Sequence, residues 1–469
     1  MPERPALRPM PAGSGELGDQ LQSAVAEMAA WMREYGDAAP HPSQHVPLAD
    51  LEAATAELRY RLRDNYPFQH PRYAGQMLKP PHPAAVIGYL TAMLVNPNNH
   101  ALDGGPATAA MEKDVVAQLA AMFGFPAAPG HLGHLTSSGT IANLEALYVA
   151  RESHPGKAIA HSADAHYTHG RMAHLLGMES IAVPTAADGT MDLDGLALLV
   201  ESGRVGTVVA TTGTTGLGAV DPVHEMLRIA RGHGVRVHVD AAYGGFFRLI
   251  ADDRPDGVAA APYLAIADCD SVVIDPHKHG LQPYGCGAVL FRDPGVAQHF
   301  LHDSPYTYFT SDDLHLGEIS IECSRAGAAA AALWLTLRLI PLTTDGLGAV
   351  LRPGRKAAMD WAARLEASDA VRLFQPPQLD IVTYFPARSR LSEVDAASVA
   401  AMAAGMSRPS ADSLHLATYT VDGAALAARG HRLDIDVPSG RILRSVLMKP
   451  EHEAAIPDLH RLLLDLLGV

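Results

Sequence analysis

The stretch S-V-V-I-D-P-H-K-H, residues 271–279, decides how the rest of the chain is interpreted. A short β-branched apolar run, residues 272–274, stops abruptly at Asp275 and Pro276, which is typical of a buried strand followed by a loop. In open α/β sheets, ligands bind outside the carboxyl ends of the strands. Lys278 therefore lies either in a binding site or, as most lysines do, on the solvated surface.

Two upstream stretches of the same kind favour the binding site. Valines alternate in V-R-V-H-V-D (residues 235–240), T-V-V-A-T (residues 207–211) is a second β-branched run, and a helical pattern lies between them at residues 223–230. This β-α-β-α-β order predicts a parallel sheet. The ends of its strands then place three polar side chains on one rim, namely Thr214, Asp240 and Lys278. A carboxylate and an amine that converge in this way indicate a cofactor site.

Composition and charge narrow the class of protein. The 469 residues are 48% hydrophobic and 19% charged, which is typical of a soluble globular chain with one large core and a smaller domain. The formal net charge of −15 argues against nucleic acid as a partner, because phosphate binding needs a basic surface. The longest apolar stretch, residues 326–337, is too short to span a membrane.

Two further features concern the compartment. The N-terminus lacks the apolar core of a signal peptide. The three cysteines, Cys269, Cys286 and Cys323, are scattered and show no C-x-x-C spacing. We therefore expect a cytoplasmic protein without membrane contact.

Changes of pattern along the chain predict three parts. Residues 1–75 contain two amphipathic helices, residues 76–340 hold the strands and helices of a large domain, and residues 341–469 form a small α+β domain. The apolar stripes of the first part recur at three- and four-residue steps, at Leu17, Leu21, Ala24, Met28 and Trp31 and at Leu48, Leu51, Thr55, Leu58 and Leu62. These stripes must be buried on the large domain or on a second copy of the chain, and the second option favours a homo-oligomer.

A candidate anion site lies in G-H-L-T-S-S-G-T-I-A-N-L, residues 133–144. Ser138, Gly139 and Thr140 open a predicted helix, and the free backbone N–H groups of a helix N-terminus bind anions. The alternative is a plain helix cap with no ligand. The pattern matches neither a Walker A motif nor G-x-G-x-x-G, so the usual signatures of nucleotide binding are missing.

Histidines are dense in S-A-D-A-H-Y-T-H-G-R, residues 162–171, but their spacing matches no zinc pattern. We expect no metal, and we interpret one of these histidines as acting on a bound ring. Two polar, irregular stretches are candidates for the walls and the lid of a site, at residues 66–110 and 304–318. The alternative for the first stretch is an ordinary connecting loop.

Three motifs in this order resemble the pyridoxal-phosphate-dependent group II amino acid decarboxylases, which include aromatic amino acid, tyrosine and glutamate decarboxylases. They are S-S-G-T-x-A-N-L (137–144), H-V-D-A-A-Y-G-G (238–245) and D-P-H-K (275–278), and the resemblance runs from about His70 to Pro450. It implies an α/β fold of the aspartate aminotransferase type (fold type I) with a mostly parallel sheet. It also implies a homodimer whose active sites lie at the subunit interface.

The resemblance assigns four residues to the cofactor ring. Lys278 resembles the lysine that binds pyridoxal phosphate covalently, and Asp240 resembles the carboxylate that pairs with the pyridine nitrogen. Ala242 resembles the small residue under the ring, and His166 resembles the imidazole that stacks on it. Lys278, Asp240 and His166, with the loop tyrosine described next, are the candidate catalytic residues.

Other residues take further family roles. Four resemble phosphate contacts: Ser138, Gly139, Thr140 and His277. Thr214 resembles a threonine that approaches the ring or the substrate. Tyr306 resembles a mobile-loop tyrosine that protonates the product, with Tyr308 as the alternative. Arg444 resembles an arginine that meets a carboxylate. Asp275 departs from the family, in which many members have asparagine, and we expect its carboxylate to face away from the phosphate.

The resemblance implies decarboxylation of a small-molecule L-amino acid. The candidate substrate walls are apolar or neutral, at Tyr73, His100, Pro106 and Thr310, and they favour an aromatic or other uncharged substrate, with Arg444 as a further tentative contact. One alternative is an aldehyde-lyase or transaminase with the same cofactor and fold. Another is a non-catalytic homologue that acts as a binding subunit, because a fold alone does not prove a function.

Overall fold

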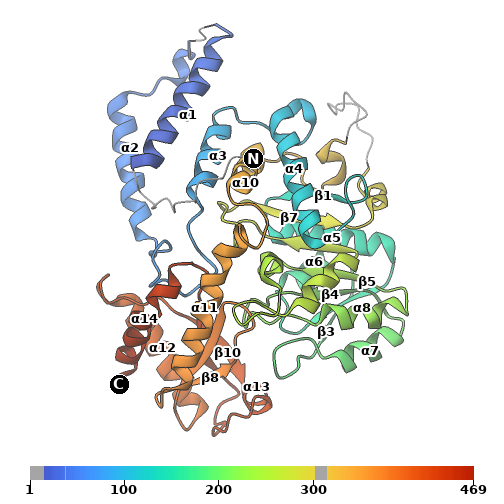
Figure 1. The fold of residues 1–469 in the computed structure, drawn as a ribbon, viewed down its shortest axis with the longest axis vertical. Helices are drawn as coiled ribbons and strands as arrows, with labels where there is room; N and C mark the ends of the chain where they lie inside the picture. The colour runs from blue at the N-terminus through green and yellow to red at the C-terminus, as the bar shows by residue number, and fades with distance from the viewer. Residues whose placement is uncertain (1–14, 37–38, 302–313) are drawn as a thin grey trace.

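The computed structural model describes residues 15–36, 39–301 and 314–469 (Figure 1). A sheet of seven strands forms its centre, in the order β1-β7-β6-β5-β4-β2-β3. All neighbours from β6 to β3 are parallel, whereas β7 runs antiparallel to both β6 and β1. The strands are β1 Leu132–Thr136, β2 Ala158–Ser162, β3 Ser180–Val183, β4 Val205–Thr211, β5 Arg236–Asp240, β6 Ser271–Ile274 and β7 Gly287–Phe291. This mostly parallel sheet confirms the predicted fold class.

The register of the sheet aligns the carboxyl ends of three strands. Thr211 of β4 lies opposite Asp240 of β5, and Asp240 lies opposite Val273 of β6. β4 and β6 are buried along their full length and β5 is buried after Arg236, as expected of a parallel sheet covered by helices on both faces. The loops that follow them therefore leave the sheet at one rim.

Helices follow most of these strands. The helix Pro106–Phe123 begins with Pro106 in its first position, where a missing N–H costs nothing. It ends at Gly124, whose φ of 81° is the left-handed conformation that favours glycine. The α-helices of this part are α3 Pro83–Met93, α4 Pro106–Phe123, α5 Gly139–Ser153, α6 Thr168–Leu175, α7 Leu193–Glu201, α8 Val223–Arg231, α9 Ala260–Leu264 and α10 Gly327–Leu339.

The C-terminal part has its own antiparallel sheet, in the order β10-β11-β9-β8. Its strands are β8 Val371–Gln375, β9 Ile381–Pro386, β10 Ala417–Asp422 and β11 Ser439–Val446. Its helices are α11 Leu347–Glu366, α12 Leu391–Ser407, α13 Gly423–Ala428 and α14 His452–Leu467. This architecture agrees with the predicted small α+β unit, while the exact division of the chain at residues 75 and 340 stays a prediction.

The two N-terminal helices, α1 Gly15–Arg33 and α2 Leu48–Arg61, stand outside the body formed by the two sheets (Figure 1). The stripe of α1 is half-buried and this helix contacts α3. By contrast, α2 has no buried residue, and Leu48 is 68% exposed. The described residues of this chain therefore leave the apolar stripe of α2 uncovered.

No α-helix in the described parts of the chain is both long and apolar enough to cross a membrane.

A buried polar network joins the large and C-terminal parts beside the rim of the main sheet. The carboxylate of Asp380, just before β9, accepts hydrogen bonds from the Tyr243 hydroxyl at 2.5 Å and from His279 Nε2 at 2.8 Å. Burial alone would raise the pKa of Asp380, but His279, the Tyr243 hydroxyl and the charge of Lys79 outweigh it and lower the pKa. Ionised Asp380 thus fixes Tyr243 and His279, which follow β5 and β6.

We expect Asp380→Ala to destabilise the protein by roughly 1–3 kcal/mol for each of the two buried donors that it leaves unpaired. Because the pKa of Asp380 is lower when folded, its contribution is present at neutral pH and is lost as the pH falls through that lowered pKa. The difference between wild type and variant in urea denaturation should therefore shrink in acid. Asp360→Ala removes an exposed partner of Arg364 and should cost less than about 1 kcal/mol. Equal effects of the two variants would contradict the role of the network.

Candidate active site

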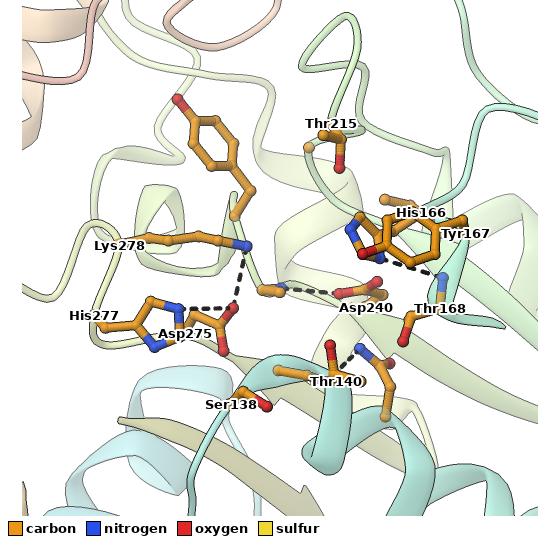
Figure 2. A pocket seen from close by; sticks show the side chains of 16 residues that line it. Ser138, Thr140, His166, Tyr167, Thr168, Thr215, Asp240, Asp275, His277 and Lys278 are labelled. Carbon is orange, nitrogen blue, oxygen red and sulfur yellow. Dashed lines mark hydrogen bonds and ion pairs between the residues drawn. The ribbon is translucent and has the colours of Figure 1, made fainter. Parts of the chain in front are cut away.

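A cavity of about 210 Å³ opens at the carboxyl ends of β4, β5 and β6 (Figure 2). Each strand end contributes to its wall: Thr211 ends β4, Asp240 ends β5, and Asp275 follows β6. The start of α5 and the segment before α6 supply the remaining walls. The lining residues are Ser138, Gly139, Thr140, Asn143, His166, Tyr167, Thr168, Thr211, Gly213, Thr215, Asp240, Ala242, Tyr243, Asp275, His277 and Lys278. Eight of the sequence-predicted residues thus meet in one place.

Asp240 is the carboxylate at the base of the cavity, and it is 5% exposed. Its Oδ1 accepts the backbone N–H of Ala242 at 3.1 Å, and its Oδ2 lies 2.8 Å from Nε2 of His169. Burial would raise the pKa of Asp240, but the hydrogen bond from His169 and the charge of Lys278 hold it well below its usual range. The carboxylate is therefore ionised at neutral pH and can pair with a cation in the cavity.

Lys278 reaches into the same cavity from the loop after β6 (Figure 2). Its Nζ lies 3.1 Å from Oδ2 of Asp275, and Nε2 of His277 lies 3.5 Å from the same oxygen. The expectation that Asp275 faces away from the site is therefore wrong. A buried carboxylate needs a charged partner, and the ammonium of Lys278, three residues on, supplies one.

The N-terminus of α5 lies against Asp275 in the cavity wall. Ser138 caps this helix, with its hydroxyl accepting the N–H of Ile141 at 3.4 Å, as the N-cap alternative predicts. A side chain at Gly139 would meet the Asp275 carboxylate, because an added Cβ would lie 2.6 Å from Oδ2. The first N–H groups of a helix have no acceptor within the helix, so this end suits an anion.

His166 forms another wall, immediately before α6. Its Nδ1 accepts the backbone N–H of Thr168 at 3.3 Å, and its ring lies 4.3 Å from that of Tyr167. Burial, more than any neighbouring charge, lowers the pKa of His166, so the imidazole is neutral at neutral pH. A neutral ring at this position can stack on a flat ligand.

Two predicted residues lie outside the cavity wall but close to it. The Thr214 hydroxyl accepts the N–H of Ala219 at 3.0 Å, and the next residue, Thr215, lines the cavity instead. The guanidinium of Arg444 is 4% exposed and donates to three backbone carbonyls, of Gly75, Thr215 and Gly216. Arg444 therefore holds the loop that carries Thr215, and its predicted contact with a substrate carboxylate stays a prediction.

The tentative substrate residues are not among the described lining residues. Tyr73 is buried against His415, and His100 lies beside Cys323, with its Nδ1 3.1 Å from the Cys323 carbonyl oxygen. Pro106 is exposed at the start of α4. Three other predicted site residues lie outside the described residues, namely Tyr306, Tyr308 and Thr310.

His169 is a functional candidate that the sequence reasoning missed. It lies three residues after His166 and is fully buried behind the cavity wall, against Asp240. No distinctive signal in the sequence indicates this role, because it depends on the contact of His169 with Asp240, which lies far away along the chain. Thr168, Thr211 and Thr215 were also missed, since strand ends and loop threonines carry no distinctive pattern, whereas Asn143 and Tyr243 lie within two of the quoted motifs but were given no role.

The polar atoms of the cavity fit pyridoxal phosphate. Thr168 Oγ1, Thr211 Oγ1 and Asp275 Oδ1 are buried without a hydrogen-bond partner among the described residues, as expected where a polar ligand completes the site. The α5 N-terminus and His277 would hold the phosphate, Asp240 the ring nitrogen, and Lys278 the aldehyde carbon. In the same described ranges, no three His, Cys, Asp or Glu side chains are grouped to bind a metal.

Comparison with known proteins agrees with this fit. The family model described as "Pyridoxal-dependent decarboxylase conserved domain" matches residues 67–385. A probable L-aspartate decarboxylase of Halobacterium salinarum is 33% identical over 276 residues, which cover 58% of this chain and 72% of the relative. An L-tyrosine decarboxylase of Enterococcus faecium is 28% identical, over 63% of this chain and 64% of the relative.

Solved structures show the same fold. The crystal structure of Oryza sativa TDC with PLP and tryptamine superposes with a TM-score of 0.77 at 18% identity, over 97% of this chain and 99% of the other. Mouse CSAD gives a TM-score of 0.77 at 20% identity, over 96% and 98% of the two chains. These structures share the α/β architecture of fold type I.

We expect Gly139→Ala to weaken binding of pyridoxal phosphate by about tenfold or more, equivalent to about 1.4 kcal/mol. The added methyl group would collide with the Asp275 carboxylate and crowd the N-terminus of α5. Titration of the visible absorption band measures the affinity. Gly232→Ala, where an added Cβ meets nothing within 4 Å, is the matched control. Unchanged affinity in Gly139→Ala would show that the phosphate does not lie at this helix end.

Proposed function

This chain belongs to the pyridoxal-dependent decarboxylase family, and from that membership we propose that it converts an uncharged L-amino acid into its amine and CO₂. The cofactor is pyridoxal phosphate, and the enzyme is a carboxy-lyase. The observation that carries the proposal is the meeting of Lys278, Asp240 and His166 in one cavity beside a helix N-terminus. Family membership favours loss of CO₂ over the transaminase, aldehyde-lyase and non-catalytic alternatives.

The cofactor supplies the electron sink, since pyridoxal phosphate disperses the negative charge left on Cα when CO₂ departs. In our proposal, the ionised carboxylate of Asp240 keeps the ring nitrogen protonated and so makes the sink stronger. Lys278 provides the amine that binds the aldehyde, and Asp275 orients that amine at 3.1 Å. Neutral His166 would stack on one face of the ring and shield it from water.

The charges of the cavity support an uncharged substrate. Among the described lining residues, Lys278 is the only lysine or arginine, and its amine is taken by the cofactor. Two carboxylates, Asp240 and Asp275, line the same space and would repel an acidic side chain. The guanidinium of Arg444 is already bonded to backbone carbonyls. The relatives are named as aspartate and tyrosine decarboxylases, so L-aspartate is the main competitor to an aromatic substrate.

The proposed activity is tested with the purified enzyme, pyridoxal phosphate and a panel of L-amino acids that includes tyrosine, tryptophan, aspartate and 2,4-diaminobutyrate. We expect amine products from uncharged amino acids, detected by mass spectrometry together with CO₂. Lys278→Ala should abolish amine formation and the visible absorption band, whereas Lys157→Ala, at an exposed lysine, should leave both unchanged. Preferred turnover of aspartate would overturn the substrate class alone, and amine transfer to a keto acid without CO₂ would overturn decarboxylation.

We further propose that the active enzyme is a homodimer in which the second copy covers the apolar stripe of α2. Leu48, Leu51 and Leu58 are each more than half exposed in this chain, and water-exposed leucines on one helix face favour association. We also propose that Tyr306 donates the proton to the product. We propose a cytoplasmic location for the enzyme.

We expect light scattering after size-exclusion chromatography to give twice the chain mass of 49.7 kDa. A variant with Leu48, Leu51 and Leu58 changed to Ser should shift this mass toward one chain, because it removes the apolar contact. Glu52→Ser, on the same helix, is the control. A wild-type protein of one chain mass would contradict the proposal.

A further inference from the structure

His169 is a buried polar group behind the candidate active site. Its side chain is fully buried, and its Nε2 lies 2.8 Å from Oδ2 of Asp240. The other carboxylate oxygen of Asp240 accepts a backbone N–H, from Ala242. Of the two described groups that bond this carboxylate, His169 is thus the only side chain, and a substitution can remove it.

The surroundings of His169 indicate which nitrogen carries the proton. Its Nδ1 is buried without a hydrogen-bond partner among the described residues. An imidazolium would leave a charged N–H unpaired there, whereas a neutral ring protonated on Nε2 leaves only a lone pair unpaired, which costs less. The geometry therefore favours a neutral imidazole that donates its single N–H to Asp240.

No neighbouring histidine among the described residues donates a hydrogen bond to Asp240 in place of His169. The ring of His161 lies 6.0 Å from that of His169, and its Nε2 is bonded to the Ser180 hydroxyl. His238 is bonded to Asn143 and Ser271, and burial lowers its pKa to about 3. His166 faces the cavity, and the charge of Lys278 acts on Asp240 from the far side of that cavity.

We infer that His169 is a positioning residue that fixes the Asp240 carboxylate and holds it in its ionised form toward the cofactor ring. This inference rests on the proposed pairing of Asp240 with the ring nitrogen. A proton shared between a carboxylate and a pyridine nitrogen moves to the more basic partner. The Nε2–H donor of His169 makes the carboxylate less basic, so the proton stays on the ring and the ring remains a strong electron acceptor.

Two substitutions distinguish the effect of the hydrogen-bond donor at position 169 from the effect of the aromatic ring. His169→Phe keeps a flat ring but removes the hydrogen bond, and His169→Gln places an amide N–H where Nε2 lies. We expect kcat to fall roughly 10- to 100-fold in His169→Phe, the range found for outer residues that orient metal ligands, with KM changed less than about threefold. His169→Gln should stay within about threefold of wild type. His174→Phe, at an exposed position of the same helix, is the control.

The decisive readout is the ¹⁵N NMR shift of pyridoxal phosphate labelled at the ring nitrogen and bound to each variant. His169→Phe should move this shift toward that of unprotonated pyridine, and His169→Gln should restore it. If His169→Phe does not fold, His169→Leu serves as the smaller apolar variant. A wild-type shift in the apolar variant, or a His169→Gln variant as impaired as it, would overturn the inference.

Asp240→Asn separates this inference from the proposed function. If Asp240→Asn alters the ring-nitrogen shift and the apolar His169 variant does not, only the role of His169 is overturned. If Asp240→Asn leaves the shift unchanged, the proposed pairing of Asp240 with the ring is itself wrong, and the role of His169 falls with it.

Discussion

The pairing register of β4, β5 and β6 is the constraint on which the site depends. Thr211 lies opposite Asp240, and Asp240 lies opposite Val273. The loops that follow the three strands therefore begin side by side at the same edge of the sheet. Slipping one strand by a single residue would turn Asp240 to the other face. The fully buried valines of these strands prevent that slip, since it would carry every apolar side chain away from its packing partners.

The two carboxylates of the cavity, Asp275 and Asp240, have different kinds of partner. Asp275 has the Lys278 ammonium at 3.1 Å, and the N-terminus of α5 adds positive potential beside it. Asp240 instead relies on the neutral donors His169 and Ala242, with Lys278 further away. One carboxylate is thus matched by a formal charge, while the other keeps an unmatched negative charge that a protonated ring nitrogen can meet.

Much of the fold and part of the site followed from local sequence pattern. Short β-branched runs ending in Asp240 and Asp275 predicted the strands and their shared rim, because strand periodicity and the parallel topology are local and general. The direction of the Asp275 carboxylate was predicted wrongly, since it depends on the contact with Lys278. His169 was missed because its role comes from a contact with Asp240, 71 residues away along the chain, which no spacing rule encodes.

We expect binding of the cofactor to stabilise the fold through Asp240. Asp240 is a buried carboxylate that stays ionised only through His169, Ala242 and the charge of Lys278. With pyridoxal phosphate bound, Lys278 would hold its aldehyde carbon, and a protonated ring nitrogen would be the cation beside Asp240. A ligand that binds only the folded state stabilises it by mass action. The cofactor would therefore complete a charge pair with a carboxylate that the sheet already holds in place.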